Sequence, residues 1–150
     1  MVYDWGRPHR IEALALSSDG RLLVATDTEC HLHVYNFITR ELEYEMDLKV
    51  KLTSVSITKD SKYILVSKVD GEARLFSVED RKSIRTFAGQ KAGNFIIRSA
   101  FGGADESFVI SGSEGTWEPR VDQLGVQSPN KNRWLYLHLA QRKWFYCGET

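Results

Sequence analysis

Two histidines, His31 and His33, are the residues of this sequence best suited to binding a metal ion. They lie in segment 31–37, whose composition predicts a β-strand, and side chains two residues apart on a strand point to the same face. Two imidazoles on one face can share a metal ion. No third ligand recurs beside them, and Leu32 and Val34 point to the opposite face as core residues. We therefore expect packing between neighbouring sheets, and no metal or other cofactor.

Two short motifs suggest catalysis but lack an essential residue. The segment from Ser111 to Gly115 approaches the Gly-x-Ser-x-Gly turn of serine hydrolases, but Ser111 occupies the place of the first glycine. Gly102 and Gly103 could begin a phosphate-binding loop, but the Gly-Lys-Ser/Thr that completes such a loop does not follow. We expect a strand and a tight turn at 111–115, no catalytic residue, and a protein that is not an enzyme.

Arg98 is the candidate residue for contact with another protein. It interrupts the apolar run 96–101, where a charge needs either a partner within the fold or a ligand outside it. A structural ion pair between neighbouring sheets is the alternative role of Arg98.

The elements that would position these residues repeat along the chain. The segment that begins at Ile11 recurs 41 residues later from Leu52. A third copy follows at a longer offset and includes Ile97, Asp105 and 108–110. A period in the low forties with four strands per copy is the spacing of a β-propeller blade. The matched pairs of the first two copies are Ile11 with Leu52, Asp19 with Asp60, Leu23 with Ile64, and Tyr35 with Phe76.

Alternating apolar residues and turn signals predict the strands of each copy. A sandwich or closed barrel would also contain short strands at this spacing, but those folds do not repeat in sequence. We expect an all-β fold, a partial β-propeller of two full blades and part of a third, with no helix longer than about three turns in 11–89. The expected strands are 11–17, 21–27, 31–37 and 41–48, then 53–59, 63–69, 73–79 and 83–89, then 95–102 and 107–113.

Acidic residues recur at the turns of the copies. Asp19, Asp60 and Asp105 could form a calcium ladder, but an aspartate that caps its own turn explains the recurrence more simply. Asp27-Thr28-Glu29 is expected to be a turn, and Asp70-Gly71 a type I′ hairpin turn.

Charge and composition narrow the partners and the compartment. Lys+Arg and Asp+Glu both number 20, so the basic excess typical of nucleic-acid and anionic-membrane surfaces is missing. The N-terminus does not resemble a signal peptide, and the two cysteines do not suggest a disulfide framework. We expect protein partners, neither nucleic acid nor membrane, and a location in the cytoplasm or in both cytoplasm and nucleus.

The strings RIEALALSSDGRLLVAT and FIIRSAFGGADESFVISGSE are the most recognisable parts of the sequence. Over about residues 5–114 the chain resembles the WD-repeat subunit of the GID/CTLH ubiquitin ligases, the family of WD repeat-containing protein 26 and glucose-induced degradation protein 7. Tyr35-Asn36 and Phe76-Ser77 stand where the Trp-Asp signature would be.

The resemblance implies a scaffold or substrate receptor that binds other ligase subunits and substrate proteins and supports proteasomal degradation. The LisH and CTLH helical segments of the family are not in these 150 residues, so the resemblance does not extend to assembly through them. An adaptor in signalling or trafficking without a ligase link is the alternative function.

The repeat stops after Glu114, which divides the chain into a lead-in at 1–10, the propeller fragment at 11–114 and a non-propeller tail at 115–150. The tail lacks the turn and the Trp-terminated strand that the repeat predicts. If the codons of Gly115 and Arg133 are GGT and AGA or AGG, a retained intron can occupy 115–133.

Removal of that intron joins codons 115 and 133 in a new reading frame. The joined codon can encode Asp, and allowed codons of 134–150 can continue with Gly-Tyr-Ile-Tyr-Ile-Trp. Together with Ser113-Glu114 this gives Ser-Glu-Asp-Gly-Tyr-Ile-Tyr-Ile-Trp, which supplies the missing strand. Residues 134–150 are thus expected to be a frameshifted blade strand. Residues 116–133 are expected to have no packed partner, with Trp117 and Pro119 exposed or loosely docked.

Overall fold

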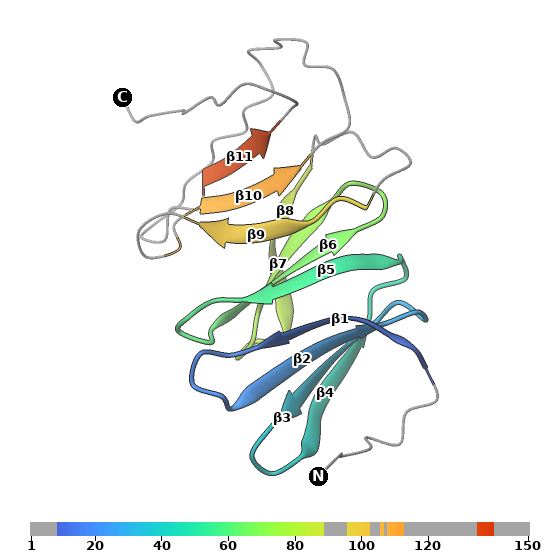
Figure 1. Cartoon of the computed structure of the whole chain (residues 1–150), viewed down its shortest axis with the longest axis vertical. Coiled ribbons are helices and arrows are strands. Elements are labelled where there is room, and N and C mark those ends of the chain that lie inside the picture. The colour runs from blue at the N-terminus through green and yellow to red at the C-terminus, as the bar shows by residue number, and fades with distance from the viewer. Residues whose placement is uncertain (1–8, 89–95, 103–105, 107, 113–134, 140–150) are drawn as a thin grey trace.

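Three β-sheets stack along the long axis of the molecule, which is a computed structural model that describes residues 9–88, 96–102, 106, 108–112 and 135–139 (Figure 1). Blade 1 contains β1 (Ile11–Leu16), β2 (Leu22–Asp27), β3 (His31–Asn36) and β4 (Glu41–Asp47). Blade 2 contains β5 (Leu52–Ile57), β6 (Tyr63–Lys68), β7 (Ala73–Ser77) and β8 (Lys82–Phe87). The third sheet contains β9 (Ser99–Gly102), β10 (Phe108–Gly112) and β11 (Leu135–Leu139).

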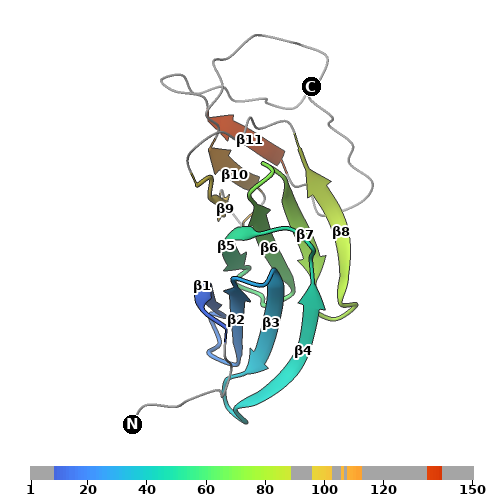
Figure 2. The same cartoon turned by 90° about the vertical axis from the view of Figure 1, so that its right-hand side faces the viewer.

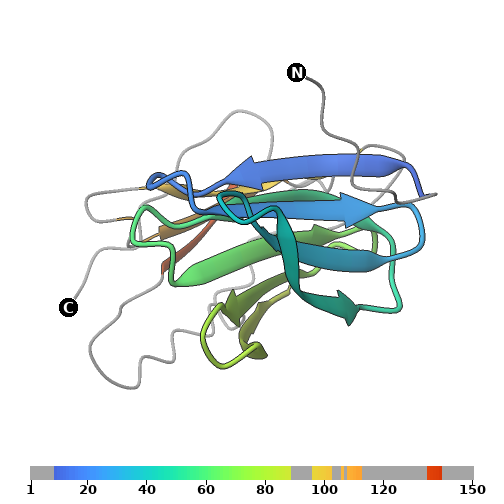
Figure 3. The same cartoon turned by 90° about the horizontal axis from the view of Figure 1, so that it is seen from below.

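Each full blade is an antiparallel meander in chain order. The first strands β1, β5 and β9 lie side by side, whereas β4 and β8 form the opposite, outer edge (Figure 2). Seen from below, the sheets overlap as layers (Figure 3). This arrangement confirms the expected all-β partial propeller, and the described residues contain no α-helix.

The repeat of 41 residues is present in the backbone as well as in the side chains. Three pairs of turn positions share a positive φ, a backbone region that favours glycine. Four of these six positions are nevertheless occupied by residues other than glycine. Matching bulges interrupt the first strand pair and the last strand pair of both blades. The pairs with positive φ are Gly20 and Ser61, Cys30 and Gly71, and Arg40 and Arg81.

Aspartates cap the first turn of both blades, as expected. The Ser17 hydroxyl donates to Asp19 Oδ1 at 2.5 Å, and the Thr58 hydroxyl donates to Asp60 Oδ1 at 2.6 Å. Hydrogen bonds from Ser17 and from a backbone N–H hold the pKa of Asp19 below its ordinary value. The third expected cap, Asp105, lies outside the described residues.

The turn at Asp70-Gly71 differs from the expected type I′ hairpin. Only Gly71 has a positive φ, of 86°. The Gly71 N–H donates to the Lys68 carbonyl at 3.1 Å, and the Lys68 N–H donates to the Glu72 carbonyl at 2.8 Å. These bonds define a three-residue loop that ends in a glycine bulge, so Asp70 needs no left-handed backbone.

Apolar side chains fill the spaces between the sheets. Leu32 and Val34 of blade 1 pack with Ile64 and Phe76 of blade 2, and all four are almost fully buried. A second cluster around Leu65, Leu75 and Val109 lies between blade 2 and the third sheet. Both faces of blade 2 are therefore covered.

On the face of blade 1 that points away from blade 2, two apolar side chains of β1 are open to solvent. Leu14 and Leu16 are 60% and 52% exposed. Their counterparts 41 residues later, Val55 and Ile57, pack into the cluster between blades 1 and 2. Leu14 and Leu16 of blade 1 are thus exposed, whereas the equivalent side chains of blade 2 are packed against blade 1.

The third sheet departs from the other two. Strand β9 begins at Ser99 rather than at the expected 95, and residues 96–98 are not part of a strand. Strand β11 pairs with β10 in the parallel direction, whereas the second and third strands of blades 1 and 2 are antiparallel. The expected intron segment 115–133 lies outside the described residues, as do Trp117 and Pro119.

Candidate functional site

Asp27, the last residue of β2, is completely buried at the turn between β2 and β3. Its Oδ1 accepts the backbone N–H groups of Glu29 and His31, both at 2.9 Å. These two bonds close the turn and fix the orientation of the carboxylate. The second oxygen, Oδ2, remains available for other partners.

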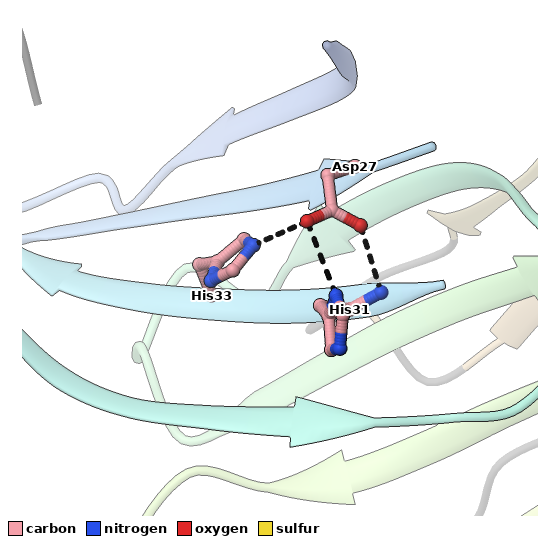
Figure 4. Close-up of side chains that lie close together, drawn as sticks. All are labelled: Asp27, His31 and His33. Carbon is pink, nitrogen blue, oxygen red and sulfur yellow. Dashed lines mark hydrogen bonds and ion pairs between the residues drawn. The ribbon is translucent and has the colours of Figure 1, made fainter. Parts of the chain in front are cut away.

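Two imidazoles face Oδ2 of Asp27 (Figure 4). His33 Nε2 lies 2.9 Å from it and His31 Nδ1 lies 3.3 Å from it. Burial acts to raise the pKa of Asp27, but the hydrogen bonds from His33 and from the His31 backbone outweigh burial and lower that pKa. The carboxylate is therefore held in its ionised form between the two rings.

Further titratable groups surround the buried His33, whose side chain is 1% exposed. Its Nδ1 lies 3.2 Å from Oε2 of Glu45, the cross-strand neighbour on β4, and among the described residues it forms no hydrogen bond of regular geometry. The ring of His9 lies 6.3 Å from the ring of His31, measured between centroids. Three of the four histidines of the chain thus gather at one end of blade 1.

The equivalent positions of blade 2 carry a different polar cluster. Lys68, Glu72 and Arg74 stand 41 residues after Asp27, His31 and His33. Lys68 Nζ, whose side chain is 3% exposed, donates to Asp70 Oδ2 at 2.9 Å and to Glu72 Oε2 at 2.8 Å. Burial acts to lower the pKa of Lys68, but these two acceptors raise it above its ordinary value.

Sequence reasoning missed the contribution of Asp27 to this cluster. The expected shared face of His31 and His33 is confirmed, and Leu32 and Val34 point to the core. The expectation of no metal site had assumed that a third ligand was missing. The hairpin brings a third possible ligand to the two rings, because it folds Asp27 back onto His31 four residues later. The signal was the spacing Asp-x3-His-x-His across a predicted turn.

Arg98 lies in the exposed connection just before β9. Its carbonyl accepts the Gly112 N–H at 3.4 Å, and among the described residues its guanidinium forms no ion pair. The alternative role, an ion pair between sheets, therefore has no support within the part of the chain that the structure describes. The role of Arg98 in binding another protein stays a prediction.

Ser111 is a buried strand residue, as the failed hydrolase motif predicted. It lies in β10 and is 1% exposed. The Ser99 hydroxyl donates to the Ser111 hydroxyl at 2.9 Å, and the corresponding pair in blade 2, Ser54 and Ser67, is bonded at 3.0 Å. These hydroxyls connect first and second strands. No helix in the described segments is long and apolar enough to cross a bilayer.

Curated proteins with WD repeats are similar to this chain, although no protein-family model matches it. GID complex subunit 7 of Schizosaccharomyces pombe is 37% identical over 121 residues, which are 76% of this chain and 24% of that protein. A WD repeat-containing protein 26 homolog of Arabidopsis thaliana is 35% identical over 130 residues, 82% of this chain and 22% of that protein. The Drosophila melanogaster homolog is 30% identical over 106 residues, 70% and 17% of the two chains.

The blades and these relatives define the class of the protein: it is a partial WD-repeat β-propeller. The chain spans about a quarter or less of the length of these relatives. It belongs to the WD-repeat family of GID complex subunit 7 and the WD repeat-containing protein 26 homologs.

Proposed function

We propose that this chain is a protein-binding scaffold of a GID/CTLH-type ubiquitin ligase and supports proteasomal degradation. The observation that carries the proposal is its family membership, since a relative at 37% identity is named a subunit of the GID complex. The partners would be other ligase subunits and substrate proteins, in the cytoplasm or in both cytoplasm and nucleus. Scaffolding of this kind uses surfaces rather than a catalytic group.

The turn between β3 and β4 is the described surface best suited to such a contact. Phe37 and Ile38 are adjacent in this turn, and they are 48% and 67% exposed. Adjacent exposed apolar side chains at the rim of a sheet are typical of protein interfaces. The turn is held from within by Asn36, whose side-chain oxygen accepts the N–H groups of Ile38 and Thr39 at 3.1 Å.

Co-purification tests the proposal. The tagged full chain is co-expressed with the other GID/CTLH subunits of its own organism, and the bound proteins are identified. We expect ligase subunits to be recovered, and Phe37→Ser with Ile38→Ser to reduce their recovery at least several-fold. Thr39→Ala, in the same turn, is the matched control and should leave recovery unchanged.

If the chain is instead an adaptor in signalling or trafficking, the same co-purification should recover a different set of proteins. Recovery of signalling or trafficking proteins, with ligase subunits missing, would overturn the ligase proposal. Circular dichroism of each variant checks that the sheets are intact, so that a loss of recovery reports on the turn itself.

A further inference from the structure

We propose that Asp27, His31 and His33 form a binding site for a divalent transition-metal ion, with Zn²⁺ as the ion that suits them best. Two imidazole nitrogens and a carboxylate oxygen are ligands of Zn²⁺, and three protein ligands leave a fourth position for water. The site lies on blade 1 and does not depend on the scaffold function proposed above.

The spacing of the ligand atoms fits one ion. One nitrogen of each imidazole and an oxygen of Asp27 all lie within 4.8 Å of one another. Two of these separations, from Asp27 Oδ2 to His33 Nε2 and to His31 Nδ1, are 2.9 and 3.3 Å. Ligands at about 2.0–2.2 Å from a tetrahedral ion are separated by about 3.4 Å. Small rotations of the side chains therefore admit an ion at the centre of the three atoms.

The aspartate is already oriented for this task. Oδ1 of Asp27 is held by the backbone N–H groups of Glu29 and His31, which leaves Oδ2 directed at the two rings. The ligands come from two hydrogen-bonded strands of one sheet, β2 and β3, so their separation is set by the hairpin. A site on paired strands loses little conformational entropy when it binds an ion.

His33 gives the strongest reason to expect a metal rather than a hydrogen-bonded network alone. A neutral imidazole that donates from Nε2 to Asp27 leaves the lone pair of Nδ1 facing Oε2 of Glu45, 3.2 Å away. In that tautomer the buried Nδ1 has no donor among the described residues and faces a carboxylate instead, which is costly in a protein interior. A metal ion on Nε2 forces the proton onto Nδ1, where it points toward the Glu45 carboxylate. Metal-binding histidines are commonly oriented by a carboxylate in this way.

Solvent reaches the site through His31, whose side chain is 25% exposed, whereas Asp27 and His33 are buried. An ion can therefore enter without unfolding the blade. The water in the fourth position would lie on this open side.

Blade 2 shows that the backbone does not need a metal at this position. In the equivalent hairpin, Lys68 pairs with Asp70 and Glu72, and Arg74 pairs with Glu72, in addition to the hydrogen bonds of the turn backbone. Exchanging the blade 1 triad for this set, as Asp27→Lys, His31→Glu and His33→Arg, should give a folded chain without the ligands. This triple variant is the matched control for metal binding.

Titration with Co²⁺ and Zn²⁺ tests the proposal on the purified, chelator-treated full chain. We expect one equivalent of Co²⁺ to produce the visible absorption of a tetrahedral site, and Zn²⁺ to displace it. Asp27→Asn and His31→Ala should weaken binding at least tenfold, and Glu45→Gln, which changes only the orienting carboxylate, by about 10- to 100-fold. The triple variant should bind no ion, and His138→Ala, outside blade 1, should bind as the unaltered chain does.

Two results would overturn the metal site. One is the lack of a stoichiometric Co²⁺ spectrum in the unaltered chain, and the other is binding that persists in the triple variant. Either result would assign the triad to a hydrogen-bonded turn only. Since the readout needs no partner protein, failure here leaves the ligase proposal standing, and failure of co-purification leaves the metal site standing.

Discussion

Asp27 and Lys68 occupy the same position of successive blades, each as the last residue of the second strand and each buried, with opposite charge. Asp27 is surrounded by imidazoles and backbone N–H groups, and Lys68 by the carboxylates of Asp70 and Glu72. The two residues therefore occupy equivalent turns with opposite charges. Replacing each by a neutral residue should change the free energy of unfolding by different amounts.

Replacing Asp27 should destabilise the chain more than replacing Lys68. Asp27→Ala leaves two backbone N–H groups and His33 without their acceptor in a buried place, at a cost of about 1–3 kcal/mol for each group left unsatisfied. Lys68→Met keeps the apolar stem, and the acceptors Asp70 and Glu72 are 41% and 34% exposed, so water can solvate them. Urea denaturation of both variants measures the difference. Equal losses would contradict this account of the two turns.

Acid should weaken the fold through Asp27. Its pKa in the folded chain is below the ordinary value of 3.8, so its stabilising contribution is complete above that value and is lost as the pH falls below it toward the folded pKa. We expect the urea midpoint to decline with acidification over this range, and to decline less steeply in Asp27→Asn. The exposed Asp60→Asn is the control, and an identical acid response in Asp27→Asn would contradict the prediction.

The open face along β1 should make the chain self-associate. Leu14 and Leu16 match the side chains by which blade 2 packs on blade 1, and exposed apolar rows of this kind favour association. Sedimentation of the purified chain should reveal oligomers, and Leu14→Lys with Leu16→Lys should reduce them. Val69→Lys, an exposed apolar residue in the turn after β6, is the control. A monodisperse monomer with a cooperative melting transition at high temperature would contradict the prediction.

Replacing Cys30 by glycine and replacing Gly71 by alanine should change the stability of the chain in opposite directions. Both have a positive φ, of 72° and 86°, in equivalent turns. Cys30→Gly removes the steric cost of a side chain in the left-handed region and should stabilise the chain by roughly 0.5–1 kcal/mol, while Gly71→Ala should destabilise it by about 1 kcal/mol. Thermal denaturation of the two variants tests the signs, and a destabilising Cys30→Gly would show that the thiol has a structural role.

The gene sequence tests the origin of the tail. We expect the codon of Gly115 to be GGT and that of Arg133 to be AGA or AGG, with a spliced transcript that encodes Asp-Gly-Tyr-Ile-Tyr-Ile-Trp after Ser113-Glu114. That product should pair with β10 in the antiparallel direction of blades 1 and 2, unlike the parallel β11 of this chain. A Gly115 codon other than GGT would rule out the retained intron.

The sequence predicted the strands well because their determinants are local. Alternation of apolar residues placed the strands of blades 1 and 2 within one or two residues, and the match of Asp19 with Asp60 identified a shared turn. The start of β9 was placed too early, since apolar residues 96 and 97 continue the pattern without pairing to β10.

The candidate site was harder to foresee because it depends on the hairpin. His31 and His33 were recognised from their spacing, but Asp27 was assigned only to a turn. Its partnership with the two rings needs the register in which Thr26 pairs with Leu32. Likewise the approach of His33 Nδ1 to the carboxylate of Glu45, twelve residues away, depends on the register of β3 and β4. Pairings of this kind are set by register and are not encoded in local composition.

Because blades 1 and 2 share turn backbones but not turn charges, the chain holds two copies of one hairpin under different chemical constraints. The same turn backbone is thus compatible with a buried carboxylate beside imidazoles in blade 1 and with a buried ammonium beside carboxylates in blade 2. A repeat fold of this kind can therefore carry different polar chemistry at equivalent positions of adjacent blades. In other propellers, buried positions whose equivalent side chains in adjacent blades carry opposite charges are therefore places to look for ligand-binding sites.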